Sequence, residues 1–204
     1  MATATPAAAA RPGPGRPSTG ARDRIVEAAL EILKSDGYGG LTTAKVAARA
    51  GQNKALISYH FGSKQGLVTE VAENVAALIT DATRVAIADV EDVEQLARAI
   101  VEAVFGVMDS DEGLQRVYFD LISQAVVDAE IDRIMRAMKH RFREVLRERL
   151  PELGVGPEDR IEAAAVFLIA GVEGLALARL ERGNDEELAG ARELWVSAVG
   201  AALG

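Results

Sequence analysis

The sequence has no cysteine and few aromatic residues, and these absences narrow the classes of protein that it can encode. Without cysteine, disulfide bonds, zinc–thiolate sites and cysteine nucleophiles are excluded. Aromatic residues make up 4% of the chain, and no proline occurs between Ser18 and Leu150. Alanine, leucine, glutamate and arginine dominate instead, which favours helix. Because no apolar/polar alternation is long enough to indicate a sheet, the sequence predicts an all-α protein.

Long hydrophobic runs are also missing. The longest, from Ala163 to Val172, has ten residues, and a transmembrane helix needs about 20. Near the N-terminus, Arg11 and four prolines interrupt the alanine-rich stretch before a signal-peptide segment develops. We therefore expect a soluble, cytoplasmic protein with no membrane partner.

Charge is distributed unevenly along the 204 residues, whose formal net charge is −8. Residues 1–68 contain nine Lys or Arg and four Asp or Glu, a net charge of +5. The remaining residues contain 14 basic and 27 acidic side chains, a net charge of −13. This asymmetry predicts that the N-terminal part faces a polyanion, which the C-terminal part repels.

Proline and glycine set off residues 1–20 from the rest of the chain. This segment holds four of the six prolines, and we expect it to form a flexible, basic arm. Its sequence Gly15-Arg16-Pro17 is similar to the core of an AT-hook, in which an arginine enters a narrow minor groove. Arg16 is thus a candidate DNA contact, and a nonspecific tether to phosphates is the alternative.

Caps and stops predict the helices in the remainder of the chain. They place helices at about residues 21–36, 43–50, 54–60, 64–88, 93–108, 114–126, 129–150, 158–182 and 186–203. The first three, within residues 21–68, form a small N-terminal head. The long fourth helix joins this head to a C-terminal helical bundle, which residues 69–204 form.

Two of the short helices form a helix-turn-helix pattern between Leu41 and Lys64. Ala47 permits the helices to cross closely, Gly51 takes the positive φ of the turn, and Ile57 anchors the second helix to the core. In an alanine-rich chain this spacing alone is weak evidence, but the basic segment around it strengthens the prediction. Residues 21–68 are therefore predicted to bind DNA.

The residues after the turn resemble a known family. The segment from Gly51 to Lys64, with Tyr59-His60-Phe61 followed by Ser63-Lys64, is similar to the TetR family of bacterial transcriptional regulators. Gly37-Tyr38 and Leu41-Thr42-Thr43 match the same pattern, so the resemblance covers about residues 22–68. Gln52 and Ser58 depart from it, because the family usually has an apolar residue and a tyrosine there. The target sequence therefore does not carry over.

The resemblance and the chemistry of the side chains together define candidate DNA contacts. Hydroxyl, imidazole and ammonium groups suit phosphate oxygens, and short or polar side chains suit base edges in the major groove. We expect phosphate contacts from Thr43, Tyr59, His60 and Lys64, and base contacts from Gln52, Asn53, Lys54, Ala55 and Ser58. For Tyr59 and His60, packing between short helices is the alternative.

The resemblance also implies roles for residues 69–204, which would bind an effector and form a dimer. The last two helices carry apolar stripes that would form a four-helix dimer interface. Its candidate residues are Phe167, Gly171, Gly174, Leu175, Leu194 and Trp195, with the core of a monomer as the alternative. The effector pocket would lie below the long helix. Its candidate lining residues are Phe105, Met108, Tyr118, Phe119, Ile122, Met135, Met138 and Phe142, with plain core as the alternative for each.

Glu173 interrupts the apolar stripe of the penultimate helix. A carboxylate at this position needs a partner, which is a group in the dimer interface, a ligand cation or an arginine such as Arg179. We favour a structural partner, because a charge across the dimer contact would also fix the register of the helices.

No pattern predicts catalysis, a metal or a cofactor. His60 and His140 lie eighty residues apart, and neither a P-loop nor a Gly-x-Ser-x-Gly sequence occurs. The basic residues between Arg133 and Arg149 alternate with glutamates, which favours an ion-paired surface over a second nucleic-acid patch. We therefore predict a homodimeric TetR-like repressor of palindromic operator DNA, released by a small, mainly hydrophobic effector. An effector-independent DNA-architectural protein or protein-partner adaptor is the alternative.

Overall fold

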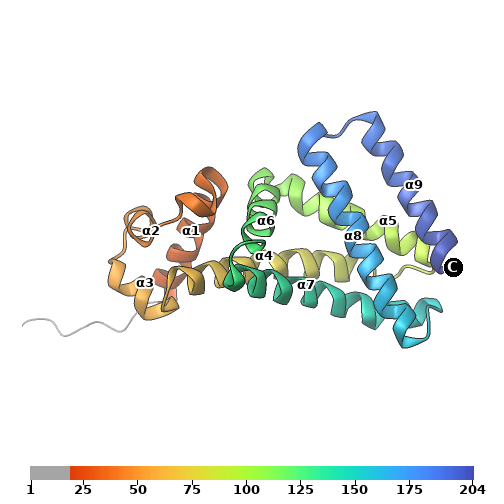
Figure 1. Ribbon diagram of the computed structural model, residues 1–204, viewed down its shortest axis with the longest axis horizontal. Helices are drawn as coiled ribbons and strands as arrows, with labels where there is room; N and C mark the ends of the chain where they lie inside the picture. The colour runs from red at the N-terminus through yellow and green to blue at the C-terminus, as the bar shows by residue number, and fades with distance from the viewer. Residues whose placement is uncertain (1–18) are drawn as a thin grey trace, which may run out of the picture.

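The computed structural model describes residues 19–204, which are helical throughout apart from short connections (Figure 1). The helices are α1 (Thr19–Gly40), α2 (Thr43–Ala50), α3 (Lys54–Phe61), α4 (Lys64–Ala86), α5 (Val93–Ser110), α6 (Glu112–Ala125), α7 (Ala129–Arg149), the 3₁₀ helix η1 (Leu150–Leu153), α8 (Glu158–Arg182) and α9 (Glu186–Leu203). No strand occurs in this part of the chain, so the predicted all-α fold is confirmed. Residues 1–18 of the predicted arm, with Arg16, lie outside the described residues, and its last two residues form the start of α1.

Side-chain caps begin the helices around the turn. The side chains of Thr42, Asn53 and Ser63 accept hydrogen bonds from backbone N–H groups in the first turns of α2, α3 and α4. The end of α1 differs from the prediction, which placed it at Asp36. A kink occurs at Gly37, whose φ is 68°, and helical structure resumes as far as Gly40. Glycine adopts this left-handed conformation without a steric penalty.

Helix α4 connects two hydrophobic cores. Its first half contributes Leu67, Val68 and Val71 to the core of the head, around Ile25 and Ile57. Its second half runs beside α5 and α7 in the bundle (Figure 1). The head core also takes in Val117 and Leu121 of α6 and Ile131, Ile134 and Met135 of α7. The head and the bundle are therefore joined by continuous apolar packing as well as by α4.

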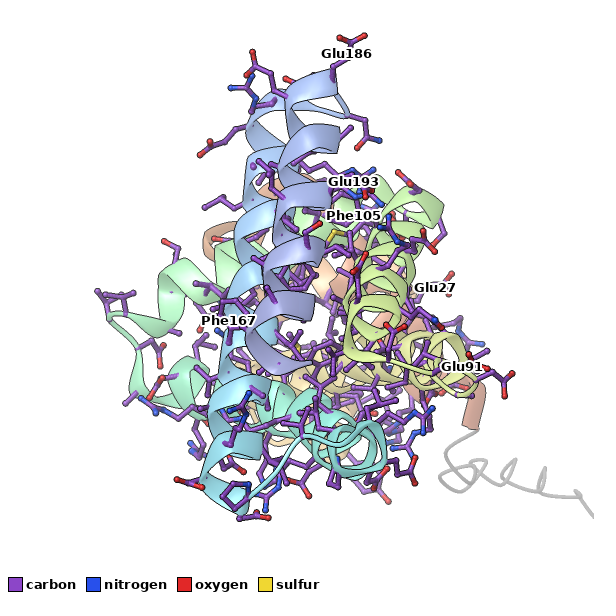
Figure 2. All side chains as sticks on the ribbon, turned by 90° about the vertical axis from the view of Figure 1, so that its right-hand side faces the viewer. Glu27, Glu91, Phe105, Phe167, Glu186 and Glu193 are labelled. Carbon is purple, nitrogen blue, oxygen red and sulfur yellow. The ribbon has the colours of Figure 1, made fainter. Side chains whose placement is uncertain are left out.

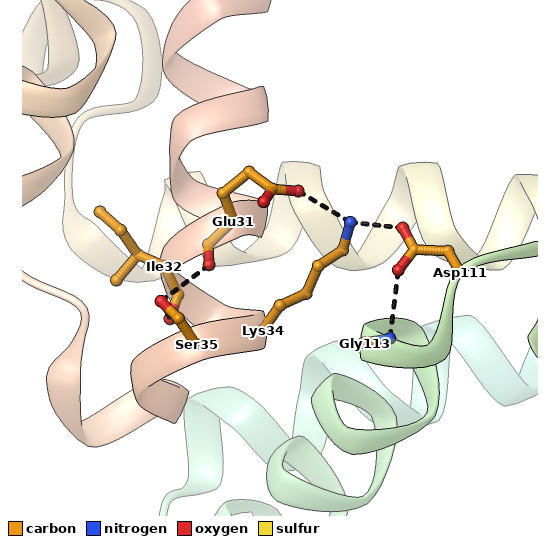
Figure 3. A network of polar contacts seen from close by, with 6 residues as sticks. All are labelled: Glu31, Ile32, Lys34, Ser35, Asp111 and Gly113. Atoms are coloured by element: carbon orange, nitrogen blue, oxygen red, sulfur yellow. Dashed lines mark hydrogen bonds and ion pairs between the residues drawn. The ribbon is translucent and has the colours of Figure 1, made fainter.

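Polar contacts between α1 and α6 reinforce this joint (Figure 3). Lys34 pairs with Glu31 and with Asp111, the N-terminal cap of α6, whose other oxygen accepts a hydrogen bond from the Gly113 N–H at 3.1 Å. Burial lowers the pKa of Lys34, but the hydrogen bonds to Asp111 and Glu31 outweigh it and leave the pKa above 10.5. The ammonium is therefore charged at neutral pH.

A second contact joins the end of α1 to α6. The Tyr38 N–H donates a hydrogen bond of 2.6 Å to the Asp120 carboxylate. The same carboxylate lies 3.0 Å from the position that a Cβ would occupy at Gly37. A side chain at Gly37 would therefore disturb the contact in addition to straining the turn.

Helix α8 is long and apolar enough by composition alone to cross a membrane. Its apolar side chains divide between two environments. Ile161, Ala165 and Leu168 lie in the bundle core, while Val166 and Phe167 are exposed on a face beside α9.

Candidate nucleic-acid interface and effector cavity

The α2–α3 turn has the geometry of a helix-turn-helix. Gly51 adopts a left-handed conformation, with φ 60° and ψ 34°, and the Gln52 N–H donates to the Ala47 carbonyl at 2.9 Å. Ala47 is buried where α2 meets its neighbours, and Ile57 is only 1% exposed in the head core. The buried side of α3 is thereby fixed, and its opposite side is presented to solvent.

The exposed side of α3 carries most of the residues predicted to contact DNA. Lys54, Ala55, Ser58 and Tyr59 are exposed, and the Tyr59 side chain reaches 70% exposure. Asn53 is also exposed, while its side-chain oxygen caps α3 by accepting from the Ala55 N–H at 2.9 Å. Gln52 and Thr43 are half-buried. The exposed side of α3 thus presents short and polar side chains, with the Tyr59 phenol beside them, along a single helix.

His60 and Lys64 are engaged within the head rather than extended into solvent. The His60 ring lies against Tyr59 and Phe61, with ring centroids 5.1 and 5.9 Å apart. Its Nε2 is buried and has no hydrogen-bond partner among the described residues. The Lys64 Nζ donates to the Tyr38 carbonyl at 3.0 Å and lies 3.8 Å from the centre of the Tyr38 ring. Burial lowers the pKa of Lys64, although Asp128 and Asp120 oppose the shift.

A cavity lies in the bundle between α4, α5, α6, α7 and α8. Its volume is about 60 Å³, and it is partly open to solvent. Its described lining residues are Ala76, Ile79, Thr80, Val104, Met108, Tyr118, Met138, Lys139, Phe142, Ile169, Val172, Glu173 and Ala176. Apolar side chains predominate, and the Thr80 hydroxyl already donates to the Ala76 carbonyl at 2.8 Å.

The cavity brings together Met108, Tyr118, Met138 and Phe142 of the eight predicted lining residues. The other four lie elsewhere. The Phe105 ring is buried between the guanidinium groups of Arg179 and Arg192, at 5.2 and 4.9 Å, and Phe119 packs against the bundle core. Ile122 and Met135 line a separate groove along α6, α7 and α8. Helical periodicity places all eight on apolar faces but does not reveal which neighbour each face meets.

Glu173 lies in the cavity wall with two partners that the sequence did not indicate. The Tyr118 hydroxyl donates a hydrogen bond to it, and the Lys139 Nζ lies 2.9 Å from the same carboxylate oxygen. Burial raises the pKa of Tyr118 well above its ordinary value, and Glu173 adds to the shift, so the phenol stays protonated as a donor. The suggested pairing with Arg179 is wrong, because Arg179 forms an ion pair with Asp109 on α5.

Comparison with known proteins identifies the family. A family model described as "Bacterial regulatory proteins, tetR family" matches residues 25–71, which contain the helix-turn-helix. A second, described as "BetI-type transcriptional repressor, C-terminal", matches residues 93–204, more than half of the chain. The chain belongs to the TetR family. As a member, it is a DNA-binding transcriptional regulator, and the resemblance inferred from residues 22–68 is confirmed.

One curated relative and two solved structures are similar to this chain. The TetR-family chain is similar to the nucleoid occlusion factor SlmA of Photobacterium profundum, with 29% identity over 175 residues, 83% of this chain and 88% of that protein. A transcriptional regulator from Pseudomonas aeruginosa PAO1 shares the fold, with a TM-score of 0.73 and 25% identity over 89% of this chain and 90% of that one. A regulator from Saccharomonospora viridis, solved in complex with choline, has a TM-score of 0.71 and 18% identity. The match covers 91% of this chain and 98% of that one.

In this TetR-family protein, α8 and α9 carry an exposed apolar face (Figure 2). Phe167 is 40% and Leu194 74% exposed, and a Cβ at Gly174 would meet nothing within 4 Å. Other predicted interface residues have partners within the chain. Leu175 is buried in the bundle core, and Gly171 contacts the Trp195 indole so closely that a Cβ would overlap it. The predicted set therefore contains both exposed and internal positions.

Sequence reasoning missed several residues that line the cavity. Those from α4 are Ala76, Ile79 and Thr80, and those from α8 include Ile169 and Val172. Thr80 carried a usable signal, because it is a polar residue on a largely apolar face of α4, where its side chain is only 8% exposed. Lys139 carried none, since it stands among seven other basic and histidine residues on α7.

Proposed function

We propose that this protein is a homodimeric, cytoplasmic TetR-family repressor, which a small, mainly hydrophobic effector releases from a palindromic operator. The position of α4 is the observation that carries the proposal. Ala76, Ile79 and Thr80 of α4 line the cavity, while Leu67 and Val68 of the same helix lie in the head core. A ligand that displaces α4 in the cavity therefore moves the DNA-binding head.

Helix α6 supports the same coupling. Its Tyr118 lines the cavity, and two residues further on Asp120 holds the Tyr38 N–H of α1. At the start of α6, Asp111 pairs with Lys34. The effector alters operator affinity only as far as it prefers the conformation that does not fit DNA, so these contacts must differ between the two conformations.

On the DNA side, α3 is the proposed recognition helix. Tyr59 and Thr43 would bind phosphates, and Lys54, Ser58 and Gln52 would meet base edges in the major groove. His60 and Lys64 reach phosphates in this proposal only after leaving part of their internal contacts. The proposed role of Lys64 is therefore both to position Tyr38 and to attract the DNA backbone.

The exposed face of α8 and α9 supports the proposed dimer. Phe167, Gly174 and Leu194 would lie at a contact with a second copy, where small residues permit close helix packing. Two recognition helices related by a twofold axis read half-sites about 34 Å apart, which accounts for a palindromic operator. Leu175 and Trp195 would support this interface from within the protomer.

A second candidate function is an effector-independent adaptor on DNA. The similarity to proteins named nucleoid occlusion factor SlmA favours it. The cavity favours the repressor instead, and so does the choline complex of the Saccharomonospora viridis neighbour, because a ligand occupies a protein of this fold. The two candidates differ in one property, which is whether a small molecule changes DNA affinity.

The experiment that separates them measures DNA binding and ligand binding on one preparation. The purified protein is tested for retardation of intergenic DNA next to its own gene, and a small-molecule library is screened for a raised melting temperature. Compounds that raise the melting temperature and also release the operator support the repressor. Compounds that raise it without release favour the adaptor, and an absence of sequence-specific retardation contradicts both.

A further inference from the structure

The cavity combines an apolar wall with one carboxylate. Tyr118 and Phe142 supply aromatic rings, and Met108 and Met138 supply polarizable thioethers. Lys139 and Glu173 are the charged groups among the described lining residues, and they are paired with each other at 2.9 Å. A charged ligand entering the cavity must therefore replace one member of this pair.

The two members of the pair are held differently. Glu173 also accepts the hydrogen bond of the Tyr118 hydroxyl, and its side chain is 23% exposed. Lys139 is 32% exposed, and it lines both the cavity and the groove on the other side, along α6, α7 and α8. The lysine thus also borders a second, solvent-open groove, whereas the carboxylate is held in the cavity wall by two partners.

Because of this difference, a ligand cation that replaces Lys139 and a ligand anion that replaces Glu173 have unequal free-energy costs. A cation at Glu173 would release the flexible Lys139 ammonium into water, where it is readily hydrated. An anion at Lys139 would instead leave Glu173 in the wall without a cation, and a partly buried unpaired charge is strongly unfavourable. The aromatic rings attract positive charge as well, through the negative potential of their faces.

We infer that the cavity takes an apolar molecule carrying a single positive charge, and that its cationic group replaces the Lys139 ammonium beside Glu173 and Tyr118. This inference rests on the proposed function, because it names the chemical class of the effector. In the complex, Glu173 and the Tyr118 ring hold the cation, and the apolar part of the ligand lies among Met108, Phe142 and Val172. Lys139 is a competitor of the ligand rather than a contact.

Three probes that share a phenyl group test the inference by calorimetry. They are benzyltrimethylammonium, the neutral benzyl alcohol and the anion phenylacetate. We expect benzyltrimethylammonium to bind best. Glu173→Gln should weaken its binding at least tenfold, since it removes the charge but keeps a hydrogen-bond acceptor. The same variant should leave the affinity for benzyl alcohol unchanged.

Lys139→Met gives the decisive result, because the two roles of Lys139 predict changes in the affinities of different probes. If Lys139 competes with the ligand, its removal raises the affinity for benzyltrimethylammonium severalfold. If Lys139 is an anion-binding residue, its removal abolishes phenylacetate binding instead. Arg136→Met is the matched control, since it removes one positive charge from the same helix at a side chain paired with Asp132. It should change neither affinity.

Melting temperature, probe binding and operator retardation are measured independently, so failure of the inference can be distinguished from failure of the proposed function. Melting temperatures without ligand show whether each variant is folded. The inference is overturned if phenylacetate binds best, if all three probes bind equally, or if none binds. If the same protein still retards operator DNA, the proposed repressor function is not contradicted. Glu173-dependent binding of benzyltrimethylammonium without operator release supports the ligand class and contradicts effector-driven release.

Discussion

Lys34 of α1 and Asp111 of α6 form an ion pair that connects the DNA-binding head to the helix carrying Tyr118 into the cavity. The Lys34 side chain is 16% exposed, so the pair is better shielded from water than most ion pairs of this protein. It lies at the N-terminal cap of α6, which makes the start of that helix sensitive to any movement of α1. The pair is therefore placed to transmit movement in either direction.

Asp111→Asn should remove this ion pair while preserving the cap, because asparagine caps helices as well as aspartate does. We expect a loss of about 1 kcal/mol in the free energy of unfolding and a smaller effect of effector on operator affinity. Urea unfolding and operator titrations with and without effector measure the two. Arg98→Met, which breaks an ion pair between α5 and α9, is the control. An unchanged effector response in Asp111→Asn contradicts the proposed coupling.

Tyr59 and Ser58 should affect DNA binding in different ways. Tyr59→Phe removes a hydroxyl proposed to bind phosphate, so affinity should fall about equally for all sequences, by about 1 kcal/mol. Ser58→Ala and Lys54→Ala should change which bases are preferred, by about 1–3 kcal/mol at one position. Selection of sites from random DNA distinguishes these outcomes. A changed base preference in Tyr59→Phe would reassign this residue to the bases.

Lys64→Met separates the two roles proposed for Lys64. Methionine keeps an apolar contact with the Tyr38 ring but loses the hydrogen bond to its carbonyl and the charge. The slope of log affinity against log salt concentration is negative. If the ammonium neutralises a phosphate, the magnitude of this slope should decrease by about 1 in the variant. If it only positions Tyr38, the melting temperature falls and the salt slope stays the same.

Two glycines of α8 should respond differently to substitution. Gly171→Ala places a Cβ against the Trp195 indole, so we expect the protomer to lose about 1–3 kcal/mol of stability. Gly174→Leu meets open space within the protomer, so it should leave folding intact and weaken the dimer. Gly106→Leu, at an open and exposed position on α5, is the matched control. Sedimentation equilibrium that finds Gly174→Leu fully dimeric would place the interface elsewhere.

The cap of α9 should make part of the stability dependent on pH. A hydrogen bond from the Leu188 N–H, with help from the Arg182 guanidinium, lowers the pKa of Asp185 below 3.8. A lowered pKa means that this stabilisation is present above 3.8 and is lost as the pH falls through the folded value. Asparagine keeps the cap but loses the charge beside Arg182, so the wild type should melt above Asp185→Asn at neutral pH, and the difference should vanish in acid. A difference independent of pH would contradict this.

Local signals explain why most of the fold was predictable. Thr42, Asn53 and Ser63 cap their helices through atoms only two or three residues away, so the sequence contains the whole interaction. Gly51 likewise marks the turn through its own backbone conformation. The extension of α1 beyond Gly37 was not predictable in this way, because the Tyr38 N–H there depends on Asp120, which is 82 residues away.

The cavity was less predictable because it depends on pairing between distant helices. Periodicity indicates that Phe105 and Met108 are both apolar-facing, yet Phe105 meets Arg179 and Arg192 while Met108 meets the cavity. The partners of Glu173 show the same limit. Tyr118 and Lys139 reach it from α6 and α7, 55 and 34 residues away, and no local pattern selects them over other polar residues.

The length of α4 has a geometric consequence for operator recognition. Its 23 residues form a continuous rod of about 34 Å, and its cavity residues Ala76, Ile79 and Thr80 lie about 18–24 Å along it from Lys64, at the head end. A tilt of about 5° at these cavity residues displaces the head end by about 2 Å, more than half the spacing of one base pair along B-DNA. In the proposed twofold-related pair the two displacements add, so a small tilt of α4 at the cavity would misalign both proposed recognition helices with the major groove.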